Sequence, residues 1–331
     1  MYDIIIIGAG PAGISMAAEA KKSGINSDKI LLIEKSHEHS WTIKKFYPDA
    51  KKVTANFKGQ PAVCQGVMCM SDTSKDEAIS YLDMAIGKYN LQVHYKESVN
   101  KLIKNEDGSF TIETNKEKYQ TTICAIAIGM MGKPNKPDYK MPPSLIKNHI
   151  HYDITSTEIK DQKVLVVGGG DSASEYAQFL SLAGNDVTLS YRQESFMRMN
   201  DINLESIKAL EEQKKLKVYL KCNVIGVEES KDSKPLVNFS EDTFASEEFD
   251  HVVYALGGST PTNFLKLLGI EFDGNTPIIT ESFETSIPGL FLIGDLSAGR
   301  KGGSLISAFN SANSAMARVC NDYLSCTLDK A

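Results

Sequence analysis

Two glycine-rich turns are the residues best suited to chemistry in this sequence. They comprise Gly8, Gly10 and Gly13 in a G-x-G-x-x-G motif, and Gly168, Gly170 and Ala173 in a G-x-G-x-x-A motif. In such motifs the first glycine permits a tight turn, the second lets the backbone approach a pyrophosphate, and the third position allows close helix packing. The following helix presents unpaired N–H groups to phosphate. Each turn is therefore predicted to bind a dinucleotide.

The elements around the two turns repeat as well. Residues 4–17 read IIIIGAGPAGISMA, and residues 164–177 read VLVVGGGDSASEYA. An apolar run without alternation suits a parallel strand that is covered on both faces. Residues 125–134 (AIAIGMMGKP) and 255–262 (ALGGSTPT) each read as a strand that ends in Ala-x-Gly. The repeat predicts two nucleotide-binding modules.

Two breaker segments place the domain boundaries. Residues 132–143 (GKPNKPDYKMPP) contain four prolines, and residues 257–263 read GGSTPTN. Two crossings predict that one domain is inserted into the other. The first domain would comprise 1–132 plus 254–331, and the inserted one 133–253. The predicted fold class is α/β, with two Rossmann-like domains of the three-layer ββα type.

Three further segments predict two β-meander hairpins and one helix within these domains. Residues 105–118 and 228–248 are polar and acidic and predict β-meander hairpins, the first with a turn at Asp107-Gly108. Residues 74–89 place Ile79, Leu82 and Ile86 on one face and predict an amphipathic helix.

The two modules differ in the residue that follows their second strand. In the first module that residue is Glu34, 21 residues after Gly13, and its carboxylate would accept hydrogen bonds from ribose hydroxyls. In the second it is Ser190, followed by Tyr191 and Arg192, with Arg198 nearby. An arginine can grip a 2′-phosphate through its planar fork, so the second module is predicted to bind NADPH. The alternative is that Arg192 is an exposed surface arginine.

The C-terminal segment distinguishes the ligand of the first module. Residues 290–295 (LFLIGD) read as a strand ending in Asp295, before the Lys301-Gly302-Gly303-Ser304 turn and a helix over 305–320. This resembles the flavin-binding signature of flavoprotein reductases with two dinucleotide domains. The resemblance implies that the aspartate bonds the ribityl chain and that the helix N-terminus faces the flavin pyrimidine ring. The first module is therefore expected to bind FAD.

The arrangement over nearly the whole chain resembles the low-molecular-weight thioredoxin reductases. That family carries a Cys-x-x-Cys just before its second glycine turn, whereas residues 149–162 here read HIHYDITSTEIKDQ. Residues 45–52 (KFYPDAKK), 128–137 (IGMMGKPNKP) and 254–265 (YALGGSTPTNFL) are similar to the cysteine-less flavodoxin–quinone reductases. The resemblance implies an NADPH-dependent FAD enzyme whose acceptor is flavodoxin or a quinone. Ferredoxin–NADP reductases of thioredoxin-reductase type and bacillithiol-disulfide reductases are neighbouring possibilities.

The candidate cofactor residues follow from the motifs and the resemblance. For FAD they are Gly8, Gly10, Pro11, Ala12, Gly13, Glu34, Lys35, Trp41, Phe46, Ala127, Gly129, Gly294, Asp295, Gly303, Ser304 and Leu305. For NADPH they are Gly168, Gly170, Asp171, Ser172, Ala173, Tyr191, Arg192, Arg198 and Gly257. No catalytic side chain is assigned, because flavin N5 carries the chemistry, and no metal site is predicted.

One lysine-rich segment is a candidate acceptor surface. It contains Lys44, Lys45, Lys51, Lys52 and Lys58 against the single acid Asp49. A basic rim would steer an acidic flavodoxin, and the alternative is a solvated loop. Trp41, Phe46 and Tyr47 in the same region would cover a flavin face, or else belong to the core.

The cysteines bear on the alternative functions of the protein. The six cysteines, at positions 64, 69, 124, 222, 320 and 326, are predicted to be free thiols. Cys64 and Cys69 have the C-x4-C spacing of larger disulfide reductases, which leaves a thioredoxin-like or low-molecular-weight disulfide reductase as an alternative function. A flavin-bearing redox sensor without turnover is another.

The composition is that of an ordinary globular protein. With 42% hydrophobic and 24% charged residues and a net charge of −6, it argues against disorder and nucleic-acid binding. No apolar run is long enough to insert in a membrane, no signal peptide is recognised, and a cytoplasmic location is expected. A homodimer is expected from the resemblance alone.

Overall fold

The chain forms two compact units in the computed structural model. The structure describes residues 1–49, 51–53, 55, 63–130, 134–240, 244–257, 262–274, 276–298 and 304–328. Unit 1 comprises Met1–Lys44, Lys52–Gly132 and Thr260–Ala331, and unit 2 comprises Lys45–Lys51 and Lys133–Ser259. Residues 45–51 and 254–259 thus fall in unit 2, whereas the sequence assigned them to the first domain.

Unit 1 is built on a sheet whose path runs β5-β2-β1-β8-β7-β6, with β19 paired to β8. Its strands are β1 (Tyr2–Ile7), β2 (Ile30–Ile33), β5 (Gln92–His94), β6 (Val99–Lys104), β7 (Phe110–Thr114), β8 (Lys118–Ile126) and β19 (Leu290–Leu292). Strands β5, β2, β1, β8 and β19 are parallel, and β6, β7 and β8 form an antiparallel meander. Residues 4–7 of β1 and all of β2 and β19 are buried, which explains the apolar runs without alternation.

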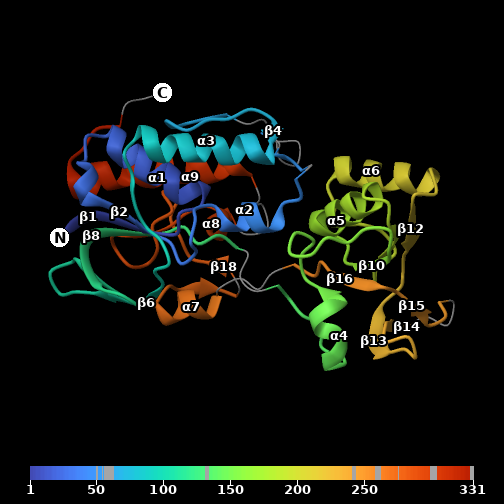
Figure 1. The fold of residues 1–331 in the computed structure, drawn as a ribbon. Helices are drawn as coiled ribbons and strands as arrows, with labels where there is room; N and C mark the ends of the chain where they lie inside the picture. The colour runs from blue at the N-terminus through green and yellow to red at the C-terminus, as the bar shows by residue number, and fades with distance from the viewer. Residues whose placement is uncertain are drawn as a thin grey trace. The chain divides into compact units, whose positions relative to one another are not determined.

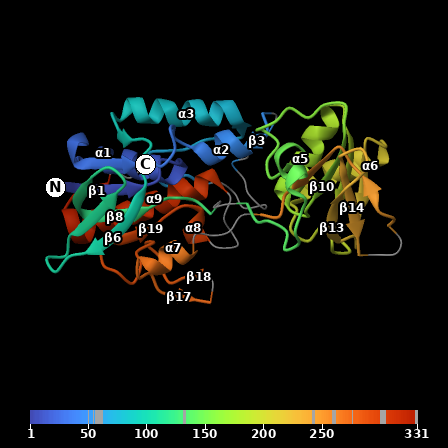
Figure 2. The same cartoon turned by 60° about the horizontal axis from the view of Figure 1, so that its bottom comes forward.

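Helices cover one face of this sheet and the meander covers the other. Helices α1 (Pro11–Lys22), α3 (Lys75–Lys88) and α9 (Leu305–Val319) lie side by side over one face (Figure 1). On the opposite face, Phe110, Ile112 and Tyr119 of the meander pack against Ile5, Ile7, Leu31 and Ile33 of the sheet. In the second view, β6 and β8 of the meander lie away from α3 and overlap α9 (Figure 2). Unit 1 therefore has the three layers of the predicted ββα type.

The shorter elements of unit 1 connect these layers. They are η1 (Ser27–Lys29), α2 (Trp41–Phe46), β3 (Lys52–Val53), β4 (Thr73–Ser74), α7 (Thr262–Leu267), β17 (Phe272–Asp273), β18 (Thr276–Pro277), α8 (Asp295–Ala298) and the π-helical turn η3 (Cys320–Leu324). Helix α2 crosses the division between the units, which falls after Lys44. The helix predicted over 74–89 is confirmed as α3, with Ser74 and Glu77 forming a capping box.

Unit 2 repeats the plan on a smaller scale. Its sheet has the order β12-β11-β10-β16-β9, and a second sheet has the order β13-β14-β15. Its elements are α4 (Pro143–Asn148), β9 (Ile150–His151), β10 (Lys163–Val167), α5 (Asp171–Leu182), β11 (Asp186–Ser190), α6 (Asp201–Glu212), β12 (Leu216–Tyr219), β13 (Val224–Glu229), β14 (Pro235–Phe239), β15 (Glu247–Glu248) and β16 (His251–Tyr254). The hairpins predicted over 105–118 and 228–248 are confirmed as β6–β7–β8 and β13–β14–β15.

Three histidines meet in unit 2: His149 after α4, His151 on β9 and His251 at the start of β16. His151 Nε2 lies 3.0 Å from His251 Nδ1, and the His149 ring stacks on that of His251. Burial, aided by repulsion from His251, lowers the pKa of His151 to about 4. Burial also lowers the pKa of His251. Both imidazoles are therefore neutral at pH 7.

These depressed pKa values predict that unit 2 loses stability in acid. Between pH 6.5 and 4 the unfolded chain binds protons that folded His151 excludes, so stability falls by roughly 2–3 kcal/mol from this group. Urea unfolding of the parent at pH 7 and 4.5 measures the loss, and His151→Leu should reduce it. His37→Leu, at an exposed imidazole, serves as the control. An unchanged pH dependence in His151→Leu would contradict the assignment.

Candidate functional site

The two glycine turns have the same backbone geometry. Gly8 N–H donates to the Ile33 carbonyl (2.8 Å), and Gly168 N–H donates to the Ser190 carbonyl (3.0 Å). Both glycines have positive φ, 108° and 154°. A Cβ on Gly8 would lie 2.6 Å from the Ala127 carbonyl oxygen, and one on Gly168 would lie 2.4 Å from that of Ala255. Each turn thus requires glycine at its first position.

The Ala-x-Gly segments complete each site at the carboxyl edge of its sheet. Ala127 N–H donates to the Ile7 carbonyl (2.8 Å), and Ala255 N–H donates to the Val167 carbonyl (2.9 Å). The glycines two residues later, Gly129 and Gly257, have φ of 67° and 78°. The repeat predicted from sequence therefore corresponds to one structural motif used twice.

The helix that follows each turn fits a phosphate. Helices α1 and α5 begin after Gly10 and Gly170 without any side-chain cap, whereas α3 and α9 are capped by Ser74 and Ser304. No atom lies within 4 Å of a Cβ built on Gly170, and the nearest to one on Gly10 lies at 4.0 Å. Uncapped N–H groups beside open backbone are the features that a pyrophosphate uses.

Glu34 lies beside the first turn as predicted, and the structure adds its contacts. One carboxylate oxygen accepts from Ala9 N–H (2.9 Å), and the other accepts from Ser36 N–H (2.8 Å). A carboxylate has about four acceptor positions, so capacity remains for ribose hydroxyls. Lys35, next in sequence, is exposed.

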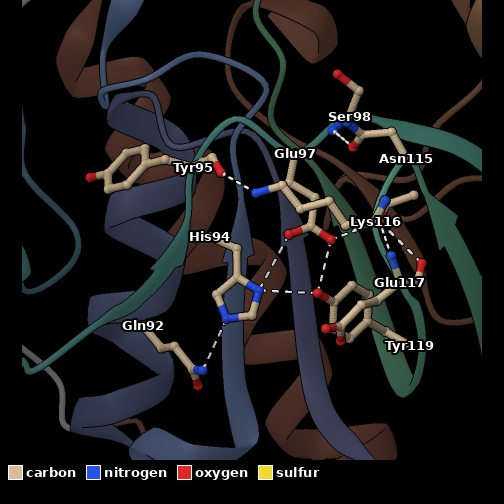
Figure 3. A network of polar contacts seen from close by, with 10 residues as sticks. Gln92, His94, Tyr95, Glu97, Ser98, Asn115, Lys116, Glu117 and Tyr119 are labelled. Carbon is tan, nitrogen blue, oxygen red and sulfur yellow. Dashed lines mark hydrogen bonds and ion pairs between the residues drawn. The ribbon is translucent and has the colours of Figure 1, made fainter.

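A polar network supports the backbone that carries Glu34. Glu97 N–H donates to the Glu34 carbonyl (3.0 Å), and Glu34 N–H donates to the His94 carbonyl (2.9 Å). The buried Glu97 carboxylate accepts from Tyr119 (2.8 Å) and lies 3.5 Å from His94 Nδ1 (Figure 3). Burial raises the pKa of Tyr119, so its hydroxyl stays a donor. The network thus anchors the strand end and the meander together.

Gly294 and Asp295 reach the same edge of the unit 1 sheet. Ile293 N–H donates to the Ile126 carbonyl (3.0 Å), which extends the pairing of β19 with β8. Gly294 has φ 75°, and a Cβ there would lie 2.9 Å from Ala12 Cβ. The Ser311 hydroxyl of α9 accepts from Gly294 N–H (2.9 Å). Asp295 therefore lies close to the start of α1.

The other residues predicted to bind FAD lie at the starts of α1 and α9 and in or near α2, apart from those discussed above and Gly303. Pro11, Ala12 and Gly13 form the first turn of α1, and Ser304 and Leu305 begin α9. Gly303 lies outside the described residues. Trp41 packs edge-on against His37, and Phe46 belongs to the segment assigned to unit 2. A role for Trp41 or Phe46 in covering the flavin stays a prediction.

Three of the five lysines in the lysine-rich segment are paired with acids and do not contribute to a free basic rim. Lys44 pairs with Glu38 (2.8 Å), Lys45 with Asp153 (3.5 Å) and Lys51 with Glu175 (2.8 Å). Lys51 also lies 3.8 Å from the centre of the Tyr47 ring. Lys52 is exposed, and Lys58 lies outside the described residues. Acids outside the segment thus neutralise the charges of Lys44, Lys45 and Lys51 in the fold.

In unit 2 the structure brings Arg198 to the glycine turn. The backbone of Arg198 forms an isolated bridge with Gly170, and both Arg192 and Arg198 are exposed. The Asp171 carboxylate accepts from Asn200 N–H (2.8 Å) and from the Asn203 amide (3.0 Å). Asp171 therefore positions the segment that carries Arg198. Ser172 is exposed and Ala173 is buried in the first turn of α5.

Gly169, the middle residue of the second turn, packs against a predicted site residue, which the sequence motif did not indicate. A Cβ there would lie 2.2 Å from the Tyr191 ring, so the missing side chain leaves room for that ring. Tyr191 also stacks on Phe196, with ring centroids 5.4 Å apart. The three consecutive glycines at 168–170 are the sequence feature that could have indicated this close packing.

The prediction that all six cysteines are free thiols is wrong. Disulfides join Cys64 to Cys69 and Cys320 to Cys326, and Cys124 and Cys222 are buried free cysteines. The spacing could not reveal this, because each pairing depends on how its loop folds back.

The described part of the chain contains neither a metal-binding cluster nor a membrane-spanning helix. Within it, no group of three or more His, Cys, Asp or Glu side chains is arranged to hold a metal ion. No helix of those same residues is long and apolar enough to cross a membrane.

Comparisons with known proteins agree with this architecture. A ferredoxin–NADP reductase of Geobacillus kaustophilus is 26% identical over 298 residues, covering 89% of this chain and 85% of that protein. The bacillithiol disulfide reductase of Staphylococcus aureus has TM-score 0.79 at 24% identity, covering 97% and 99% of the two chains. The thioredoxin reductase of T. acidophilum has TM-score 0.79 at 22% identity, covering 98% and 99%. At these identities the two structures show the fold.

The fold and paired glycine turns define a two-dinucleotide flavoprotein reductase. The family described as pyridine nucleotide-disulphide oxidoreductase matches residues 5–294, and the chain belongs to this family. It is an NAD(P)H-dependent flavin oxidoreductase with the thioredoxin-reductase-like α/β fold, and its cofactors are FAD and NADPH.

Proposed function

We propose that this protein passes electrons from NADPH, by way of FAD, to flavodoxin or a quinone. The observation that carries the proposal is the stretch before the second glycine turn. Residues 149–162 form β9 and a loop without a cysteine, where the resembling thioredoxin reductases have their dithiol. The curated relatives named ferredoxin–NADP reductase support an electron carrier as acceptor, and ferredoxin is the alternative.

The proposed roles of the residues follow from the two sites. In unit 1, the α1 N-terminus would hold the FAD pyrophosphate, Glu34 its ribose, and Asp295 its ribityl chain. In unit 2, the α5 N-terminus would hold the NADPH pyrophosphate, and Arg192 and Arg198 its 2′-phosphate. FAD, when bound, supplies hydride acceptance and electron release in one- or two-electron steps. The chain's own part is binding, orientation and exclusion of water.

An anaerobic titration with NADPH tests the proposal. We expect one NADPH consumed per FAD, followed by sustained turnover with flavodoxin or a soluble quinone. The variant Cys64→Ser/Cys69→Ser should keep that turnover, and Cys320→Ser/Cys326→Ser is the matched control. Two NADPH per FAD in the parent and one in the Cys64/Cys69 variant would instead establish a disulfide reductase. Oxidation that stops after one cycle with every acceptor would indicate a redox sensor.

A further inference from the structure

A disulfide in unit 1 lies outside the residues assigned to the two cofactor sites. It joins Cys64 and Cys69, whose Cα atoms are 5.6 Å apart, within the loop of residues 63–70. We propose that this bond is a thiol–disulfide exchange site, opened and closed reversibly by a small or protein dithiol. The proposal concerns a reaction that is independent of the flavin acceptor.

The loop is held in place by side chains of three helices. The Asn310 amide of α9 donates to the Val63 carbonyl (2.8 Å) and accepts from Gln65 N–H (3.0 Å). Glu19 of α1 accepts from Val67 N–H (2.7 Å), and Tyr81 of α3 accepts from Cys69 N–H (3.0 Å). These four hydrogen bonds fix the backbone on both sides of the disulfide.

Burial anchors the same loop from beneath. Met68 is 1% exposed and belongs to the core between the helices and the sheet. Glu19 is also buried, and its second oxygen accepts from Asn313 (3.3 Å). Leaving this buried carboxylate without its hydrogen-bond partners would be unfavourable. The loop therefore keeps its position without help from the sulfur–sulfur bond.

The two cysteines remain accessible while their loop is fixed. Cys69 is exposed and Cys64 is half-buried, whereas in the other disulfide Cys320 is 5% exposed and Cys326 is half-buried. An accessible disulfide on a fixed loop suits exchange, because reduction leaves the two thiols close enough to re-form the bond. The second disulfide lacks this access at Cys320.

The proposed exchange balances atoms and electrons. A thiolate of the incoming dithiol attacks Cys69 Sγ, and the bond to Cys64 breaks. Cys64 leaves as a thiolate and takes a proton from solvent. The second thiol of the reductant, as thiolate, then attacks the mixed disulfide. Cys69 is released as a thiolate that is protonated in turn, and the reductant becomes a cyclic disulfide. The protein gains two electrons and two protons.

Timed reduction of the native holoenzyme tests this assignment. The protein is exposed to dithiothreitol, quenched with iodoacetamide, and its alkylated cysteines are quantified by mass spectrometry. We expect Cys64 and Cys69 to be alkylated at least about tenfold faster than Cys320 and Cys326, and to re-form their bond on return to oxidised dithiothreitol. In guanidinium the two rates should converge. Equal rates in the native protein would overturn the proposal.

Hydrogen exchange distinguishes an exchange site from a structural staple. In the reduced protein, the amides of Val67 and Cys69 should keep their protection within about twofold, because Glu19 and Tyr81 still bind them. Asn310→Ala, which removes two of the anchoring bonds, should raise exchange in the loop in both redox states. Collapse of protection on reduction alone would identify the disulfide as the anchor and overturn the proposal.

Discussion

Gly8→Ala is expected to yield a colourless protein that has lost FAD and still binds NADPH. The new Cβ would lie 2.6 Å from the Ala127 carbonyl oxygen, and Gly8 is held at φ 108°, where alanine is strained by about 1–2 kcal/mol. The turn must shift, and the α1 N–H groups then leave the pyrophosphate. We expect flavin content to fall below about a tenth of the parent value, a loss of at least 1.4 kcal/mol in binding.

Gly168→Ala should produce the opposite result. Its Cβ would lie 2.4 Å from the Ala255 carbonyl oxygen, so NADPH binding should be lost while the protein stays yellow. Flavin absorbance per chain and NADPH fluorescence titration measure the two losses.

Gly24→Ala is a matched control for both variants. Gly24 has φ 96°, but no atom lies within 4 Å of a Cβ built there. It therefore introduces the backbone strain without the clash. Loss of both cofactors from all three variants would mean general unfolding and would contradict the assignment.

Removing the arginines of unit 2 should abolish discrimination between NADPH and NADH. Arg198 is bridged to Gly170 and Arg192 follows β11, so both lie by the second turn. A charge-assisted hydrogen bond contributes about 1.5–3 kcal/mol. We expect each alanine variant to lower kcat/KM for NADPH about tenfold or more, and the double variant about 100-fold, with NADH unchanged. Steady-state kinetics with a quinone acceptor measure this.

Variants of Lys208 and Asp171 distinguish the effect of losing any positive charge from the effect of displacing Arg198. Lys208→Ala removes one positive charge from an exposed site on α6 and should change neither cofactor's kcat/KM. Asp171→Ala should weaken NADPH binding, because the Asp171 carboxylate accepts from Asn200 N–H and so holds the segment that carries Arg198. Asp171→Asn should keep much of the parent kcat/KM for NADPH, because its amide oxygen can still accept the hydrogen bond from Asn200 N–H. Equal losses with NADH and NADPH in the arginine variants would refute the 2′-phosphate site.

Much of the fold followed from local residue patterns. Residues 4–7 of β1 and 164–166 of β10 are buried and all apolar, so these runs are recognisable in sequence. The turns at Gly8 and Gly168 need positive φ, which only glycine adopts readily, so their residue type is diagnostic. The capping box of α3 likewise uses two residues three positions apart, Ser74 and Glu77.

Features that depend on distant contacts were missed for a common reason. Lys51 meets Glu175 across more than a hundred positions, so a charge run read alone suggested a free basic surface. Cys64 and Cys69 pair because Glu19, Tyr81 and Asn310 fold their loop, and none of these lies in the cysteine motif. The contacts of Asp171 with Asn200 and Asn203 were not visible in sequence, because these residues lie about thirty positions away.

The sequence by itself determined the two glycine turns, their Ala-x-Gly partners, and the acid in one module against arginines in the other. These depend on backbone conformation and on residue types at fixed short spacings. Only the tertiary structure decided which charges are neutralised, which cysteines pair, and which side chains position Arg198. Such pairings depend on which elements pack together, and short-range spacing carries no information about that packing.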